Sequence, residues 1–123
     1  MNGLRGALLV AAGAAVGAPL RFLVDRWARA RYDAGTIIGT LVVNIAGSFV
    51  LGIAAGWSSA PSWVLPLVGI GFCGALTTFS TLAFETWVFL ERREWRPFAA
   101  NLALSLGLGL PAVWLGWALG TAL

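Results

Sequence analysis

Glycines and hydroxyl side chains are concentrated in one apolar stretch of the chain, residues 69–85. Seven of its 17 residues are of these two kinds: Gly69, Gly71, Gly74, Thr77, Thr78, Ser80 and Thr81. The stretch lies within 51 consecutive uncharged residues, 34–84, so we expect lipid or protein around it rather than water. A break in a helix here would free carbonyls that suit a cation and N–H groups that suit an anion. The alternative is an unbroken helix, in which the glycines are packing contacts and the hydroxyls bond to carbonyls four residues earlier.

Two phenylalanines and one carboxylate accompany these hydroxyls. Phe79 and Phe84 flank them, and an anion can pass against the partially positive edge of an aromatic ring. Ordinary packing against lipid or in a core is the alternative for each ring. Glu85 is the only acidic residue within the apolar region, so a functional role is the first hypothesis for it. It lies about 33 Å along a helix from Trp63, which favours a hydrogen-bonding role at a pore mouth over proton coupling at the membrane centre.

Further polar side chains recur at intervals of four residues, and therefore on one face of a helix. They form the stripes Thr40, Asn44 and Ser48, and Asn101 and Ser105. Both stripes offer N–H and O–H donors without a cationic group, which suits a small anion that must not bind too tightly. Hydrogen bonding between helices is the alternative.

The composition indicates a small integral membrane protein of the all-α class. Only 11% of the 123 residues are charged and the mean hydropathy is +0.87, whereas soluble domains have about 25% charged residues. All eight basic residues are arginine, and the absence of histidine removes the usual proton shuttle and the commonest metal ligand. The single cysteine, Cys73, cannot form an internal disulfide. The net charge of +3 does not indicate nucleic-acid binding, because the arginines cluster beside apolar segments, where they set topology.

Four apolar segments are predicted to cross the membrane as one domain, at about residues 4–28, 36–57, 63–90 and 97–122. The third would be about 40 Å long as one helix, against a hydrocarbon core of about 30 Å, which favours a strong tilt or a break. Four helices hardly enclose a conduction path by themselves, so we expect an oligomer, most simply a dimer.

Charged residues gather at the ends of these segments. Arg21, Asp25 and Arg29 follow one another at intervals of four and can pair along one helix face, with Arg21 anchoring or snorkelling at the helix end. Six arginines lie near the first and third loops, at 26–31 and 92–96. The positive-inside rule therefore favours both termini outside.

Three sequence motifs occur along the chain, one in each of the first three apolar segments. Residues 71–81 read Gly-Phe-Cys-Gly-Ala-Leu-Thr-Thr-Phe-Ser-Thr and are followed by Glu85. Residues 39–48 read Gly-Thr-Leu-Val-Val-Asn-Ile-Ala-Gly-Ser, and residues 17–21 read Gly-Ala-Pro-Leu-Arg. The three motifs, the chain length and the four-span layout resemble the Fluc/CrcB family of fluoride channels over the whole chain.

The resemblance implies a passive fluoride channel of the cytoplasmic (inner) membrane, not an enzyme, that lowers toxic internal fluoride. It implies a third helix broken near mid-membrane and a dual-topology dimer, with two copies in opposite orientations around a central sodium ion. Carbonyls of Gly74 and Thr77 match the sodium ligands, and Arg21 matches the first-helix arginine. The matching positions along the fluoride pathway are Thr40, Asn44, Phe79, Ser80, Thr81, Glu85 and Ser105.

Two features depart from the family pattern. The second pathway phenylalanine is replaced by Leu82, which offers no positive ring edge. The arginine bias is the other, because a dual-topology protein should be nearly balanced, so the partner is either a second copy or an oppositely oriented paralogue. Two rival functions stay open: a proton-coupled multidrug or cation exporter, also a dimer of four-helix subunits, and a scaffold protein that transports nothing.

Overall fold

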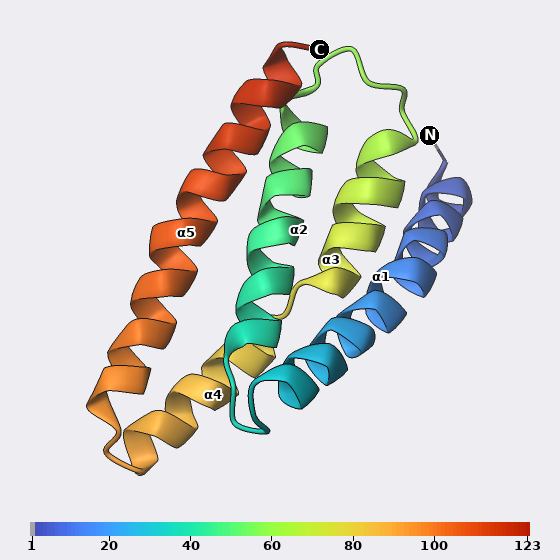
Figure 1. Ribbon diagram of the computed structural model, residues 1–123. Helices are drawn as coiled ribbons and strands as arrows, with labels where there is room; N and C mark the ends of the chain where they lie inside the picture. The colour runs from blue at the N-terminus through green and yellow to red at the C-terminus, as the bar shows by residue number, and fades with distance from the viewer. Residues whose placement is uncertain (1) are drawn as a thin grey trace.

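The computed structural model describes residues 2–123, which form an all-helical bundle without strands in that range (Figure 1). Its elements are α1 (Gly3–Arg31), α2 (Ile38–Gly56), the π-helix η1 (Leu65–Cys73), α3 (Gly74–Leu76), α4 (Phe79–Glu91) and α5 (Trp95–Thr121). Four helical stretches are long and apolar enough to cross a membrane: α1, α2, the stretch from Leu65 to Glu91, and α5. The prediction of an all-α chain with four spans is confirmed.

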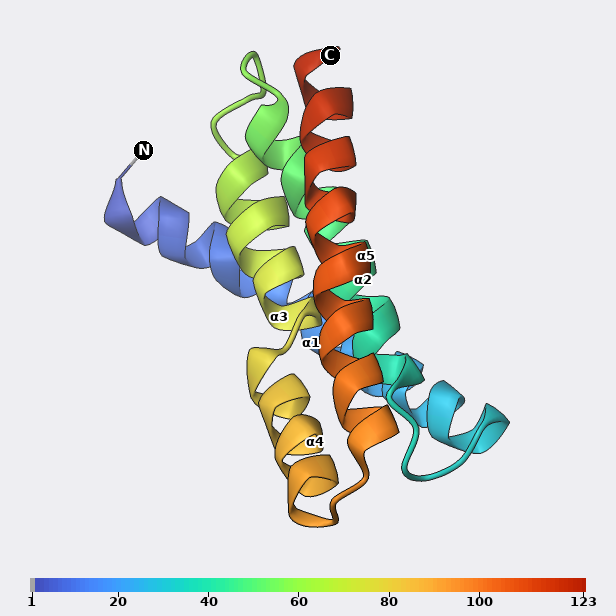
Figure 2. The same cartoon turned by 90° about the vertical axis from the view of Figure 1, so that its left-hand side faces the viewer.

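The helices form two closely packed pairs. Helix α5 runs beside α2 along its length, and α1 crosses obliquely against η1 (Figures 1 and 2). Helix α4, the second half of the third span, turns away below η1 and α3 and reaches the lower end of α5. Both termini lie at the same end of the subunit, as four crossings require (Figure 1).

Glycines let the backbones of α2 and α5 approach closely. A methyl group on Gly52 or Gly56 would overlap a carbonyl of α5, and one on Gly116 or Gly120 would overlap a carbonyl of α2. The four glycines therefore form a reciprocal contact between parallel helices, of the small-residue type common between membrane helices.

Glycines also let the backbones of α1 and η1 approach closely. A methyl group on Gly13 would overlap the Leu67 carbonyl, and one on Gly17 would overlap the Phe72 carbonyl. A methyl group on Gly71 would likewise overlap the Val10 carbonyl of α1. The two glycine pairs spaced by four residues, at 13–17 and 116–120, thus both lie in helix contacts.

The third span is broken, but later in the chain than the glycines suggested. Gly74 has helical angles, φ −62° and ψ −36°, so the predicted break between Gly74 and Thr77 is corrected at its first residue. The extended residues are Thr77, with φ −81° and ψ 159°, and Thr78, with φ −150° and ψ 115°. The difference has a physical reason: Gly71 is used for helix packing, whereas Thr78 finds hydrogen bonds outside the helix.

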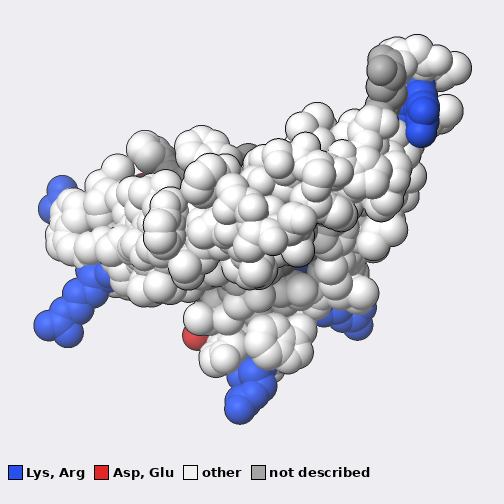
Figure 3. All heavy atoms as spheres, turned by 90° about the horizontal axis from the view of Figure 1, so that it is seen from above, with Lys and Arg blue, Asp and Glu red and all other residues white. Residues whose placement is uncertain are grey.

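The outer surface of the subunit is mostly apolar. Large hydrophobic side chains such as Leu106, Leu110 and Trp114 are exposed on α5. Seen from above, charged side chains protrude at the rim and leave the rest of that face uncharged (Figure 3). Such a surface suits lipid or another subunit rather than water, and the chain is a multi-pass membrane protein.

Candidate functional site

Asn44 on α2 holds the break in the third span. Its Nδ2 donates to the Thr78 carbonyl at 3.1 Å, and its Oδ1 accepts from the Thr78 N–H at 2.8 Å. In an unbroken α-helix that N–H would donate to the Gly74 carbonyl. One side chain therefore satisfies both backbone groups of Thr78 and deprives Gly74 of its helical donor.

The Thr78 hydroxyl begins the next helix. It accepts from the Thr81 N–H at 3.2 Å and so caps α4. It also donates to the Thr81 hydroxyl at 3.1 Å and lies 3.2 Å from the Ser80 hydroxyl. The partial positive charge of the α4 N-terminus is thus presented at the break, among three hydroxyl groups.

Thr78 lies within the third-helix motif, residues 71–81, but it is not among the predicted site residues. Only 7% of it is exposed, and it forms hydrogen bonds with three predicted site residues, Asn44, Ser80 and Thr81. A hydroxyl residue directly before a helical run is an N-cap signal, and this signal could have identified it.

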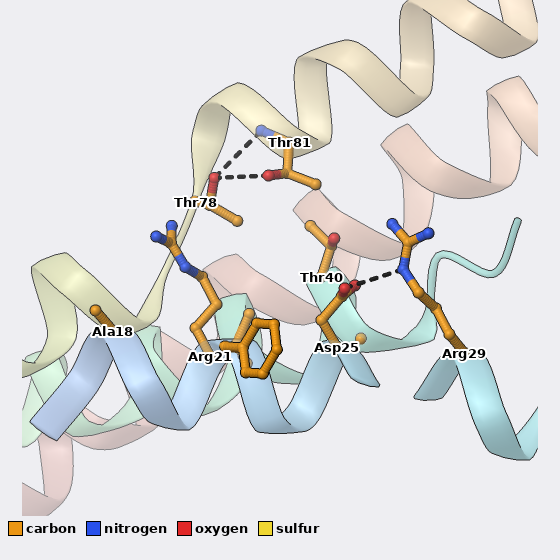
Figure 4. Close-up of a pocket in the computed structure, with 10 residues that line it drawn as sticks. Ala18, Arg21, Asp25, Arg29, Thr40, Thr78 and Thr81 are labelled. Carbon is orange, nitrogen blue, oxygen red and sulfur yellow. Dashed lines mark hydrogen bonds and ion pairs between the residues drawn. The ribbon is translucent and has the colours of Figure 1, made fainter. Parts of the chain in front are cut away.

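A first cavity, of about 320 Å³, lies between α1, α2 and α4 (Figure 4). Thr40, Thr78 and Thr81 line one side of it, and Arg21, Asp25 and Arg29 line the other. The polar and cationic lining suits water and anions better than lipid.

The charged residues of this cavity contact one another and the neighbouring backbone. The predicted pairing along α1 is confirmed for Asp25 and Arg29, whose Oδ2 and Nε lie 2.9 Å apart. Arg29 also donates to the Ala34 carbonyl at 3.1 Å. Arg21 is partly buried and extends toward the break, with Nη1 3.5 Å from the Thr77 carbonyl oxygen (Figure 4).

A second cavity, of about 310 Å³, lies on the other side of the break. It brings together most of the remaining predicted residues: Asn44, Gly74, Thr77, Phe79, Leu82 and Ser105. The Ser105 hydroxyl is buried and has no hydrogen-bond partner among residues 2–123. Phe79 is 81% exposed, so this cavity is open toward the outside of the subunit.

The two cavities meet at the break, because Thr78 lines both. The structure therefore divides the predicted pathway residues into two groups. Thr40 and Thr81 belong to the first cavity, whereas Phe79, Leu82 and Ser105 belong to the second.

Glu85 lies beside the first group. Its Oε2 accepts a hydrogen bond from the Thr40 hydroxyl at 3.3 Å. Its Oε1 is buried and has no hydrogen-bond partner within the described part of the chain. The Glu85 carboxylate thus keeps one oxygen free to accept a hydrogen bond, beside the Thr40 hydroxyl.

The polar stripe on α5 is split between two environments. Ser105 lines the second cavity, whereas Asn101 is 1% exposed and donates to the Thr86 hydroxyl at 3.1 Å. Thr86 was not singled out from the sequence, because its partner depends on how α4 and α5 face each other.

Known proteins resemble this chain over almost its whole length. A family model described as CrcB-like protein, Camphor Resistance (CrcB), matches residues 8–117. The chain belongs to this family. The resemblance seen in the three sequence motifs is therefore confirmed.

Individual relatives of this CrcB-family chain carry the name of a fluoride channel. "Fluoride-specific ion channel FluC 1" of Geobacillus kaustophilus is 45% identical over 113 residues, covering 92% of this chain and 96% of the relative. The protein of the same name from Frankia casuarinae is 45% identical and covers 94% and 95%. "Fluoride-specific ion channel FluC" of Vibrio cholerae is 37% identical and covers 88% and 89%.

Proposed function

We propose that this chain forms a fluoride-selective channel that exports fluoride passively across the cytoplasmic membrane. The observation that carries the proposal is the break at Thr78, held by Asn44 between two cavities of a membrane span. Relatives with 37–45% identity are named fluoride-specific ion channels, which supports fluoride as the ion.

Neutral donors along the two cavities would replace the hydration shell of the ion. The free Ser105 hydroxyl and the N-terminus of α4 offer O–H and N–H groups, and Phe79 offers a ring edge. Arg21 and Arg29 would raise the local concentration of anions in the first cavity. Neutral donors hold an anion weakly enough for it to leave again.

A partner would complete the second cavity. Its open side and the exposed Phe79 leave one wall of the pathway missing in a single subunit. A second copy in the opposite orientation, or an oppositely oriented paralogue, would supply that wall. The partner would also supply the aromatic edge that Leu82 lacks.

The residues at the break fit a sodium ion. Thr78 donates to Asn44 instead of Gly74, and Thr81 donates to the Thr78 hydroxyl instead of the Thr77 carbonyl. Both carbonyl oxygens, at Gly74 and Thr77, thereby lose their helical donors at the negative end of a helix. These two carbonyls would hold the ion, which would supply a fixed positive charge between two subunits.

Fluoride efflux from proteoliposomes that contain only this chain tests the proposal. With potassium inside and valinomycin present, we expect rapid efflux at a fluoride electrode, no comparable chloride efflux, and no requirement for a proton gradient. Efflux that needs a proton gradient and disappears in Glu85→Gln would instead identify a proton-coupled exporter. If only a mixture with an oppositely oriented paralogue is active, the partner is the paralogue; silence of every combination would contradict the channel.

A further inference from the structure

The hydrogen bond between Asn101 and Thr86 connects α5 to the second half of the third span. Asn101 Nδ2 donates to Thr86 Oγ1 at 3.1 Å, and Thr86 Oγ1 donates to the Leu82 carbonyl at 2.8 Å. The Thr86 hydroxyl therefore donates to a carbonyl of its own helix and accepts a hydrogen bond from Asn101 on α5. These two hydrogen bonds link Asn101 to the backbone of Leu82, which lines the second cavity.

Helix α4 has little else to fix its position. None of its residues, Phe79–Glu91, is buried. From α2, Asn44 bonds to Thr78, the N-cap of α4, and Thr40 donates to Glu85 within the helix. Among residues 2–123, the Asn101–Thr86 bond is the only side-chain hydrogen bond between α4 and α5.

This bond also sets a register. Helices α4 and α5 are antiparallel, so one turn before Thr86 on α4 corresponds to one turn after Asn101 on α5. Those neighbours are Leu82 and Ser105, and both line the second cavity. Asn101 itself is 1% exposed and lines none of the cavities described above, so it does not face the pathway.

We propose that Asn101 and Thr86 are positioning residues that fix α4 against α5 and thereby set the gap between Leu82 and the Ser105 hydroxyl. This inference rests on the proposed fluoride channel, in which that gap is part of the ion pathway. A shift of α4 along α5 would move Leu82 relative to the buried Ser105 hydroxyl, which has no hydrogen-bond partner among residues 2–123.

Replacement of the hydroxyl tests the role with little change of volume. We expect Thr86→Val to slow fluoride efflux by about tenfold or more, since misplacing a preorganised group by about 1 Å can cost on the order of 100-fold. Thr86→Ser keeps the hydroxyl and should restore efflux to within about twofold of wild type. Thr121→Val is the matched control, because the exposed Thr121 hydroxyl bonds only within its own helix, to Ala118 at 2.7 Å.

Asn101→Leu and the double variant separate positioning from direct contact with the ion. If the two residues act as one unit, Thr86→Val, Asn101→Leu and the double variant should show equal loss. Loss in Asn101→Leu with normal efflux in Thr86→Val would overturn the inference in favour of direct lining. Wild-type efflux in both single variants, or failure of Thr86→Ser to restore it, would also overturn it.

Cross-linking gives a readout that does not depend on fluoride. Ala83 and Leu102 line a common cavity between α4 and α5, and both can be replaced by cysteine in a Cys73→Ala background. We expect bifunctional maleimide cross-linking to fall at least about threefold in Thr86→Val and to recover in Thr86→Ser. If the wild-type chain shows no fluoride efflux, the proposed function fails, whereas an unchanged cross-linking rate in Thr86→Val shows separately that the pair does not set the register.

Discussion

Ser105 is a buried hydroxyl that the isolated subunit leaves without a partner among its described residues. An unsatisfied buried polar group costs about 1–3 kcal/mol, so a residue kept for stability alone would not be a serine here. Asn44 is the opposite case, because its amide makes two hydrogen bonds to Thr78. In the proposed channel, Ser105 would therefore contribute to conduction, whereas Asn44 also contributes to the structure of the same cavity.

We predict that Ser105→Ala slows fluoride efflux while leaving the melting temperature in detergent unchanged or higher. The hydroxyl forms no hydrogen bond within residues 2–123 that the substitution could remove, whereas a dehydrating anion loses one donor worth about 1–3 kcal/mol. Efflux from proteoliposomes and thermal unfolding by circular dichroism measure the two effects. Thr121→Val, at an exposed hydroxyl that lines neither cavity, is the control. A drop in melting temperature without slower efflux would contradict the prediction.

At the level of single residues, the motifs predicted residue types better than partners. The stripe of Thr40 and Asn44 faces the third span, as its four-residue spacing suggested. Asn101 has the same spacing to Ser105 but is turned to Thr86, away from the second cavity. Spacing fixes which side chains share a helix face, but the rotation of that face is decided by neighbours far away in sequence.

At the level of elements, the close packing of α2 against α5 depends on glycines. Helices α2 and α5 lie so close that Gly52 and Gly116 each face a carbonyl of the other helix. Without a hydrophobic driving force between helices in lipid, such close backbone packing is a main source of association. This contact holds α5, and with it Ser105, against α2.

We expect Gly116→Ala to lower the free energy of unfolding by about 1–3 kcal/mol, because the methyl group would overlap the Phe49 carbonyl. Gly107→Ala is the matched control on the same helix, where a methyl group would meet no described atom within 4 Å. Thermal unfolding in detergent and recovery of folded protein compare the two. Equal stability of both variants would show that α2 and α5 can separate without loss.

Arg93 occupies a backbone position that favours glycine. Its φ is 56°, and the bonds from Arg93 N–H to the Leu90 carbonyl and from Glu94 N–H to the Phe89 carbonyl, 3.1 and 2.9 Å, close α4 as a Schellman motif. A residue with a Cβ pays a cost in this left-handed conformation that glycine avoids.

Arg93→Gly is therefore expected to raise the free energy of unfolding by roughly 0.5–1 kcal/mol. Arg92→Gly removes the same charge at a residue with φ −81°, and it should lower stability by about the same amount. Denaturant or thermal unfolding of both variants in one detergent checks the difference. A loss of stability in Arg93→Gly as large as in Arg92→Gly would contradict the backbone explanation.

The break shows where prediction of elements from this sequence stops. Hydroxyls and glycines in an over-long span indicated an interruption between Gly74 and Thr77, whereas the break lies at Thr77 and Thr78. Gly71 instead receives the backbone of α1. A glycine used for close packing and one used for a break look the same in a sequence, because both depend on what lies opposite.

The whole subunit presents its second cavity on an open side. Gly109 lines that cavity, and a methyl group there would meet no described atom within 4 Å. The face combines polar groups with exposed apolar side chains such as Phe79. Lipid does not satisfy the polar groups, which supports the proposed partner subunit on this side.

On the proposal of a dimer that covers this face, Gly109→Leu should weaken dimer formation by about tenfold or more, because added side-chain volume at a packed contact costs about 1–3 kcal/mol. Gly107→Leu is the control, since Gly107 lines none of the described cavities. Light scattering across a dilution series in detergent measures the dimer, and circular dichroism checks that both variants fold. Equal dimerisation of the two variants would place the partner elsewhere.

The break at Thr78 also determines how the membrane potential acts on this protein. The helical stretches on either side, 65–76 and 79–91, are each about 20 Å long, less than the hydrocarbon core of about 30 Å. Water that filled the arginine-lined cavity would extend the aqueous phase to Thr78 and compress the voltage drop into the remaining distance. A monovalent ion crossing that distance still gains about 2.3 kcal/mol per 100 mV. An anionic blocker held in the cavity beside Arg21 would sense only a small share of the applied voltage.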